Sequence, residues 1–133
     1  MLFAAFAFGL AAAGIGSDTG GSVRIPAAWN DLVGLKTTHG RLSLEGVVPL
    51  CATFDTVGPL CRTVGDAALV LEALEGGKRP ADLAGATLKG QRFIVLETIT
   101  MDGVRAESLK AFDDAIKRMQ AAGTEIVTRT FVP

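Results

Sequence analysis

The sequence predicts an α/β fold in which a mixed or parallel sheet is flanked by helices. The most direct indication is the order strand, helix, strand in the last third of the chain, at Phe93–Leu96, Ala106–Ala122 and Glu125–Phe131. Strands in this order pair in parallel through the crossover helix. Apolar residues at helical spacing indicate another helix over Val64–Leu74. The 133 residues have the length of one ordinary domain.

The first elements are mostly apolar. Residues Met1–Ile15 contain no charged side chain. A secretory signal peptide would carry Lys or Arg ahead of its apolar run, and a membrane-spanning helix would need about 20 apolar residues. We therefore expect a buried core helix in this segment. A short helix is expected over Ser22–Asn30, followed by a short buried strand over Val33–Lys36.

The middle of the chain combines a loop with a well-defined helix. Residues 41–62 are expected to form a loop because they contain several residues that interrupt helices and strands. These residues are Gly46, Pro49, Gly58 and Pro59. Thr63 is a suitable N-cap for the helix Val64–Leu74, and Gly76 and Gly77 are suitable to end it.

The last part of the chain begins with a polar connection over Lys78–Lys89. Phe93–Leu96 is expected to be a buried strand. The helix Ala106–Ala122 has an apolar face opposite a charged one. The apolar face consists of Leu109, Phe112, Ala115, Ile116 and Met119. Gly123 is suited to end this helix before the strand Glu125–Phe131.

Composition excludes several classes of partner. The formal net charge is -1 and no run of Lys or Arg is present, so we expect neither nucleic acid nor a membrane surface as a partner. Cys51 and Cys61 are the only cysteines and are expected to be reduced and packed. No Cys/His cluster has the spacing of a zinc site, so no metal is expected. We expect no cofactor.

One segment, Gly16–Arg24 with the sequence GSDTGGSVR, is difficult to explain by packing alone. Two glycines precede Ser22, which is expected to open a helix, and this arrangement directs backbone N–H groups toward the hydroxyl. Such a nest of donors can form an oxyanion hole. The segment lacks the Gly-Lys-Ser/Thr of a P-loop, the third glycine of a dinucleotide fingerprint and the Gly-x-Ser-x-Gly elbow. A glycine-rich turn with Ser22 as a helix N-cap explains the residue types equally well.

A nucleophilic serine also needs a base. The only histidine, His39, lies in an expected turn, where a surface role is the more common one. A Ser-His-Asp triad is therefore disfavoured, and a Ser-Lys arrangement remains open. Lys36 is the nearest lysine in sequence, but nothing in its local sequence would lower its pKa.

Three stretches resemble the amidase signature family. They are GSDTGGSVRIPAA at residues 16–28, VGLKTT at 33–38 followed by Gly40 and Arg41, and FDTVGP at 54–59 before Arg62, Thr63 and Val64. All lie in the family's order, and the resemblance extends over about residues 10–74. Residues 75–133 fit the family only as ordinary α/β sequence.

The resemblance implies a serine amidase with a Ser–cis-Ser–Lys triad on a large α/β fold. Ser22 would attack an amide carbonyl, and backbone N–H groups of Thr19, Gly20 and Gly21 would hold the oxyanion. Asp18 and Arg24 would support the loop. The substrate would be a small-molecule amide, and the location cytoplasmic. In this interpretation the chain is a single partial amidase domain, with the family's core at residues 1–75 and a βαβ-like continuation at 76–133.

The family's cis-serine and lysine lie upstream of its nucleophile, and neither is found in these 133 residues. We therefore expect a fragment that is inactive alone, or one that needs a partner chain to supply the missing N-terminal part. A stand-alone amidase is one origin, and the glutaminase subunit of a tRNA-dependent amidotransferase is another. That subunit usually has Gln where this chain has Ile25 and Tyr where it has His39, which favours the stand-alone class. A non-catalytic or split half is the third interpretation.

Overall fold

The computed structural model describes residues 2–77 and 79–131. The chain divides into two compact units, one up to Leu83 and one from Ala84 onward. The first unit contains α1 (Leu2–Ala7), β1 (Gly14–Asp18), α2 (Arg24–Trp29), β2 (Val33–Gly34), β3 (Thr56–Cys61) and α3 (Val64–Leu74). The second contains β4 (Arg92–Glu97), the short 3-10 helix η1 (Ile99–Met101), α4 (Ala106–Ala121) and β5 (Glu125–Thr130).

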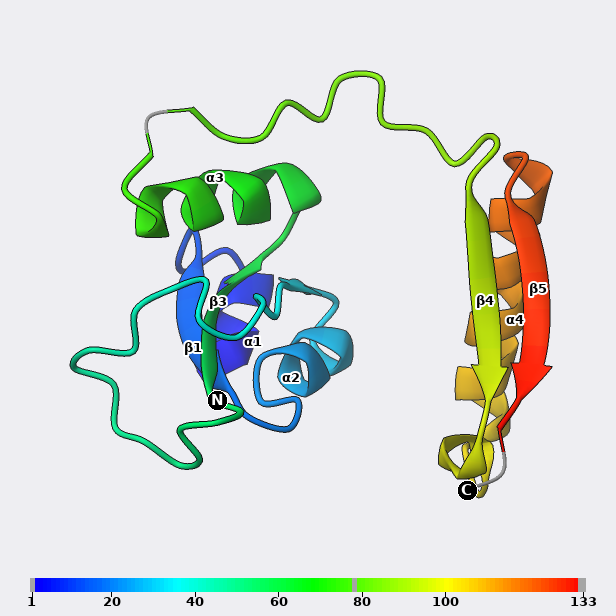
Figure 1. Ribbon diagram of the computed structural model, residues 1–133, viewed down its shortest axis with the longest axis horizontal. Helices are drawn as coiled ribbons and strands as arrows, with labels where there is room; N and C mark the ends of the chain where they lie inside the picture. Colours follow the sequence, from blue (N-terminus) through cyan, green and yellow to red (C-terminus); the bar gives the residue numbers. More distant parts are fainter. Residues whose placement is uncertain (1, 78, 132–133) are drawn as a thin grey trace. The chain divides into compact units, whose positions relative to one another are not determined.

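The sheet of the first unit has the order β1-β3-β2, with both pairs antiparallel, and β1 and β3 run side by side in Figure 1. The register pairs Gly14 with Leu60 and Asp18 with Thr56. A small apolar core formed by Val23, Ala27 and Leu60 joins α2 to β3. This core holds the start of α2, which follows the candidate site, against β3.

The expected long core helix at the N-terminus is wrong. In the described part of that segment, α1 ends at Ala7 and β1 already begins at Gly14; Met1 lies outside the described residues. Gly9 has a φ of +74°, a left-handed conformation that interrupts the helix. The Arg62 guanidinium then donates hydrogen bonds to the carbonyls of Phe6 and Ala11, both at 3.1 Å. Phe8 is 81% exposed, so the segment is not a buried helix.

The expected loop over residues 41–62 is wrong at its end, because β3 is the central strand of the sheet. Gly58 permits this pairing: a Cβ atom there would lie 1.9 Å from the carbonyl oxygen of Leu35. Pro59 lacks an N–H, but its carbonyl accepts a hydrogen bond from the Leu35 amide at 3.0 Å. The two residues that suggested a turn are thus compatible with a strand. The strand expected over Val33–Lys36 is confirmed as the shorter β2.

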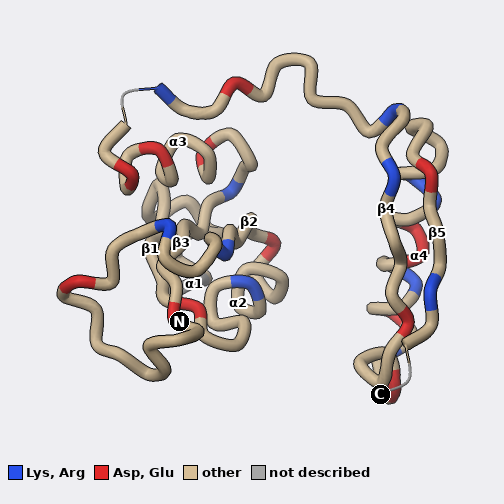
Figure 2. The backbone as a smooth tube through the Cα atoms, in the orientation of Figure 1, with Lys and Arg blue, Asp and Glu red and all other residues tan. Residues whose placement is uncertain are grey.

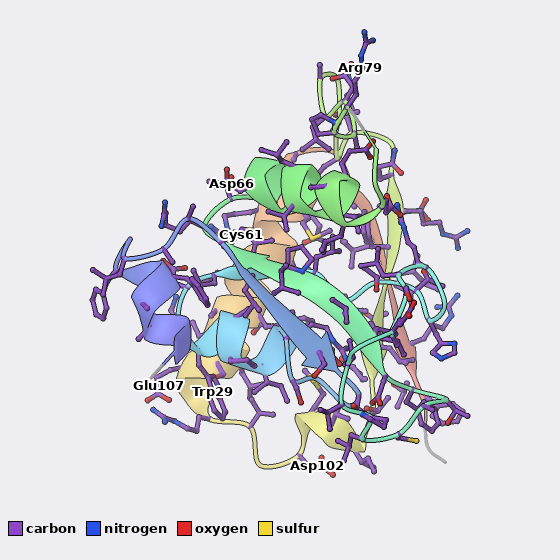
Figure 3. The ribbon with its side chains drawn as sticks, turned by 90° about the vertical axis from the view of Figure 1, so that its left-hand side faces the viewer. Trp29, Cys61, Asp66, Arg79, Asp102 and Glu107 are labelled. Atoms are coloured by element: carbon purple, nitrogen blue, oxygen red, sulfur yellow. The ribbon has the colours of Figure 1, made fainter. Side chains whose placement is uncertain are left out.

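Helix α3 confirms the expected bounds Val64–Leu74. The Thr63 side chain accepts a hydrogen bond from the Asp66 amide at 3.1 Å, as an N-cap does. After the helix, the amide of Gly76 donates to the carbonyl of Ala73. Cys61 and Cys51 are free thiols, the first buried and the second partly exposed. Figure 3 shows Cys61 near the first turn of α3, which carries Asp66.

The second unit confirms the βαβ prediction. Strands β4 and β5 pair in parallel from Arg92 with Glu125 to Glu97 with Thr130, and α4 connects them. Blue and red positions are interspersed along the chain of this unit in Figure 2. The expectation that Phe93–Leu96 is buried is wrong, since Ile94 is 64% exposed. With two strands, α4 and the short η1 described, this unit leaves apolar side chains of β4 exposed, among them Phe93, Ile94 and Leu96.

None of the helices in the described ranges combines the length and apolar character required to cross a bilayer.

Candidate active site

The candidate site is the turn between β1 and α2, residues 19–23. Strand β1 ends at Asp18, and α2 begins at Arg24, two residues later than the helix expected from Ser22. Gly21 has a φ of +128°, a conformation that residues with a side chain rarely adopt. A Cβ atom on Gly21 would also lie 2.7 Å from Cδ1 of Ile25. The backbone conformation is therefore the main reason for glycine at this position, because the end of the half-exposed Ile25 side chain can move away from an added Cβ.

A buried carboxylate organises the turn from within. Asp18 is 0% exposed and accepts hydrogen bonds from the backbone amides of Gly21 at 2.7 Å, Val23 at 3.2 Å and Arg24 at 3.4 Å. The Arg24 guanidinium donates two more, from Nε at 3.0 Å and Nη2 at 3.1 Å. The hydrogen bond from Arg24 and those from the three amides lower the pKa of Asp18 to about 2, although burial opposes this shift. Asp18 is therefore ionised at neutral pH.

A second buried carboxylate, Asp55, lies just before β3 and contacts the turn at Thr19. The Thr19 hydroxyl donates a short hydrogen bond to Oδ1 of Asp55. The other carboxylate oxygen accepts from the amides of Leu50 and Cys51, both at 2.9 Å. The hydrogen bond from Thr19 is the main reason that the pKa of Asp55 is lowered. No sequence pattern assigned Asp55 a role, although it lies within the FDTVGP stretch.

Ser22 lies in the turn immediately before α2 with its side chain exposed. Its hydroxyl makes no hydrogen bond with any residue that the structure describes. The alternative interpretation of Ser22 as a helix N-cap is wrong: the N-cap position is occupied by Val23, and no side chain caps this helix. A serine held in this way by a fixed backbone, with its hydroxyl unpaired, is available to an incoming electrophile.

The three amides expected to hold an oxyanion differ in their availability. The amide of Gly21 already donates to Asp18, so an oxyanion would have to compete with a carboxylate for it. The amides of Thr19 and Gly20 have no hydrogen-bond partner among the described residues. The nest of donors expected from the two glycines is thus reduced to Thr19 and Gly20 in this conformation.

The described residues do not supply a base in contact with Ser22. His39 is exposed, and its Nε2 lies 3.0 Å from the carbonyl oxygen of Ala52. Lys36 is half-buried and forms no hydrogen bond with the serine. Within residues 2–77 and 79–131, no group of three His, Cys, Asp or Glu side chains is arranged to hold a metal ion. The turn thus offers an exposed hydroxyl and two backbone amides without partners, and no described residue places a proton acceptor in hydrogen-bond contact with that hydroxyl.

The family model and the relatives that match this chain both concern amidase-family proteins. The family model described as Amidase matches residues 4–132. The glutamyl-tRNA(Gln) amidotransferase A-subunit of Ligilactobacillus salivarius (strain UCC118) is 38% identical over 135 residues, covering 92% of this chain and 28% of that protein. The protein of the same name from Chlorobium chlorochromatii (strain CaD3) is 44% identical over 102 residues, covering 77% of this chain and 22% of that protein.

Solved structures of amidases and amidotransferase subunits also resemble the chain. The glutamyl-tRNA(Gln) amidotransferase A-subunit of Thermotoga maritima has a TM-score of 0.86 at 29% identity, covering 96% of this chain and 31% of that one. The native peptide amidase of Stenotrophomonas maltophilia has a TM-score of 0.77 at 35% identity, covering 95% and 29%. The chain thus spans less than a third of the length of these proteins. Both enzyme classes considered from the sequence are represented.

Proposed function

Because the chain belongs to the amidase family, we propose that it is part of a serine amidase that cleaves a carboxamide through Ser22. The Ser22 oxygen forms a bond to the carbonyl carbon while its proton passes to a base, and the C–N bond then breaks as the nitrogen leaves protonated. Water attacks the resulting ester and releases the acid. The observation that carries this proposal is the exposed, unpaired Ser22 hydroxyl in a turn held on both sides by buried carboxylates.

The supporting roles follow the geometry of the turn. We propose the amides of Thr19 and Gly20 as oxyanion donors. Gly21 contributes its left-handed backbone conformation, and its amide becomes a third donor when its hydrogen bond to Asp18 breaks. Asp18 and Arg24 support the loop, since their ion pair joins the end of β1 to the start of α2. Removal of one oxyanion donor typically costs about 10²–10³-fold in rate, so small displacements of this backbone matter.

We propose that the base that accepts the Ser22 proton lies outside these 133 residues. The resemblance implies a cis-serine and a lysine, and no described residue offers either beside Ser22. We propose that the 133-residue chain has no turnover alone and that a further segment or a partner chain completes the triad. Since the family model matches across both compact units, we also propose that they belong to one partial amidase domain.

The substrate class distinguishes two candidate functions. A stand-alone amidase acting on small carboxamides is favoured by Ile25, a half-exposed apolar side chain beside Gly21, where a glutamine is usual in the amidotransferase protein. A glutaminase function is favoured by the relatives, which are named as subunits of glutamyl-tRNA(Gln) amidotransferase. The two free thiols are compatible with a reducing compartment, and we propose a cytoplasmic location.

Ammonia release tests the proposal. The protein expressed from the whole reading frame that contains these residues is offered benzamide, propionamide, a C-terminally amidated dipeptide and L-glutamine. Hydrolysis of one or more amides is expected, with a loss of at least about 10³-fold in Ser22→Ala. Ser108→Ala makes the same change at an exposed position of α4 and is expected to keep the rate. Turnover that survives Ser22→Ala contradicts the proposal, and turnover of glutamine alone supports the amidotransferase alternative.

A further inference from the structure

Asp55 connects the candidate site to a distant part of the chain. It lies immediately before β3, and its side chain is buried, with 3% of the residue exposed. One carboxylate oxygen receives the hydroxyl of Thr19, 36 residues away, and the other receives the amides of Leu50 and Cys51. All of these are donors, as an ionised carboxylate requires. The carboxylate thus lies between the turn that carries Ser22 and the loop that precedes β3.

The next residue reinforces this connection. The hydroxyl of Thr56 donates to the carbonyl oxygen of Asp18 at 3.0 Å. Asp55, immediately before β3, and Thr56, its first residue, therefore hold Thr19 and Asp18, where β1 ends. Beyond Thr19 the chain continues into Gly20 and Gly21, which have no side chains by which to be held. The amide of Gly21 is held directly by Asp18, so the direction of the preceding Thr19–Gly20 peptide depends on the anchor at Thr19.

We infer that Asp55 is a positioning residue of the amidase reaction, one that orients the Thr19–Gly20 peptides toward the oxyanion through the Thr19 hydroxyl. This inference rests on the proposed function of Ser22. Asp55 does not touch the reacting atoms. Its effect is on the transition state, because the oxyanion forms only there, and not on the binding of the uncharged amide. A loop anchor without this role would affect folding and leave the rate of the folded protein unchanged.

The chain offers a matched pair of variants at Thr19. Thr19→Val keeps the shape of the side chain and removes the donor to Asp55, while Thr19→Ser keeps the donor and removes a methyl group. Both leave the backbone amides in place. Asp55→Asn removes the charge at the other end of the same hydrogen bond. Displacement of catalytic groups by about 1 Å can cost about 10²-fold in rate. We expect kcat to fall about 10- to 100-fold in Thr19→Val and Asp55→Asn, with KM changed less than about twofold, and Thr19→Ser to restore most of the rate.

The experiment measures two rates on the protein from the whole reading frame. One is ammonia release from the amide that it hydrolyses best. The other is labelling by an alkyl fluorophosphonate, in which the Ser22 oxygen bonds to phosphorus, fluoride leaves and the phosphoryl oxygen takes the oxyanion position. Both rates are expected to fall in parallel. The double variant Thr19→Val/Asp55→Asn is expected to be no slower than the slower single variant, since both substitutions act on the same Thr19–Asp55 hydrogen bond.

The outcomes separate the two proposals. If Ser22→Ala keeps turnover and labelling, the proposed function itself is wrong. If Ser22→Ala abolishes both while Thr19→Val matches Thr19→Ser, only the positioning role is wrong. Thermal unfolding identifies variants that are folded at the assay temperature. If Thr19→Val and Asp55→Asn both unfold there, Asp55 is a structural anchor and the inference is overturned.

Discussion

Asp18 is the residue on which the geometry of the turn depends most, and Asp18→Asn tests this. The substitution keeps the size of the side chain and removes its charge. Asparagine retains one acceptor oxygen, but its amide nitrogen is a donor and would face other donors. These are the backbone amides of Val23 and Arg24 and the guanidinium of Arg24. The loss therefore has an electrostatic part and a hydrogen-bonding part.

The size of the effect follows from the pKa and the burial. The pKa of Asp18 falls from 3.8 to about 2, and one pKa unit corresponds to about 1.4 kcal/mol. Because the Arg24 side chain is 52% exposed, solvent screens part of the interaction, which leaves about 1–2 kcal/mol. Buried donors left without an acceptor add about 1–3 kcal/mol. We expect Asp18→Asn to lower the free energy of unfolding by about 2–5 kcal/mol.

Urea unfolding followed by circular dichroism measures this difference, and hydrogen exchange localises it. The amides of Gly21 and Val23 are expected to exchange faster in the variant, because Asp18 is their acceptor. Asp114→Asn is the matched control: its carboxylate pairs with Lys110 on the exposed side of α4, where such a pair contributes less than about 0.5 kcal/mol. Equal effects of the two substitutions would refute the assignment of Asp18 as the anchor of the turn.

The pH dependence has a defined sign. The folded-state pKa of Asp18 is depressed, so its contribution to stability is complete above the unfolded value near 4 and is lost as the pH falls through about 2. The difference in stability between wild type and Asp18→Asn is expected to be constant above about pH 4 and to shrink between about pH 4 and 2. A difference that grows in this range would contradict the assignment.

Further predictions concern packing in the first unit. Gly58→Ala is expected to destabilise the protein severely, because its Cβ would collide with the carbonyl oxygen of Leu35. Gly65→Ala in α3 meets no close atom and is expected to raise the free energy of unfolding by about 0.5–1 kcal/mol. Equal urea midpoints for the two variants would contradict this. Burial raises the pKa of the Cys61 thiol, so a disulfide reagent at about pH 8 is expected to modify Cys51 quickly and Cys61 only after unfolding. Two fast thiols in the native protein would count against the packing of β3.

The elements with strong local signals were predictable from sequence. Helices α3 and α4 were predicted to within a residue or two because their apolar spacing, the Thr63 cap and the terminal glycines all agree. The parallel β4–β5 pair followed from the order of elements. These features depend on short-range chemistry that the chain shows directly.

Features that depend on long-range contacts were missed. The sequence predicts a loop in place of β3 because Gly58 and Pro59 usually end strands, and only the closeness of Leu35 explains their presence in one. The sequence predicts an N-terminal helix that is too long, because no local pattern shows that Arg62 holds the turn after α1. Asp55 has no local pattern of its own as a site residue. Its contact with Thr19 spans 36 residues, and no spacing rule gives it.

The most direct test of the central claim is to locate the nucleophile. The protein from the whole reading frame is labelled with an alkyl fluorophosphonate, digested with trypsin and analysed by mass spectrometry. The account predicts an adduct on Ser22, within the peptide that ends at Arg24, and loss of that adduct in Ser22→Ala. An adduct on the neighbouring Ser17 instead, or amide hydrolysis by a protein whose Ser22 stays unmodified under complete inhibition, would contradict it.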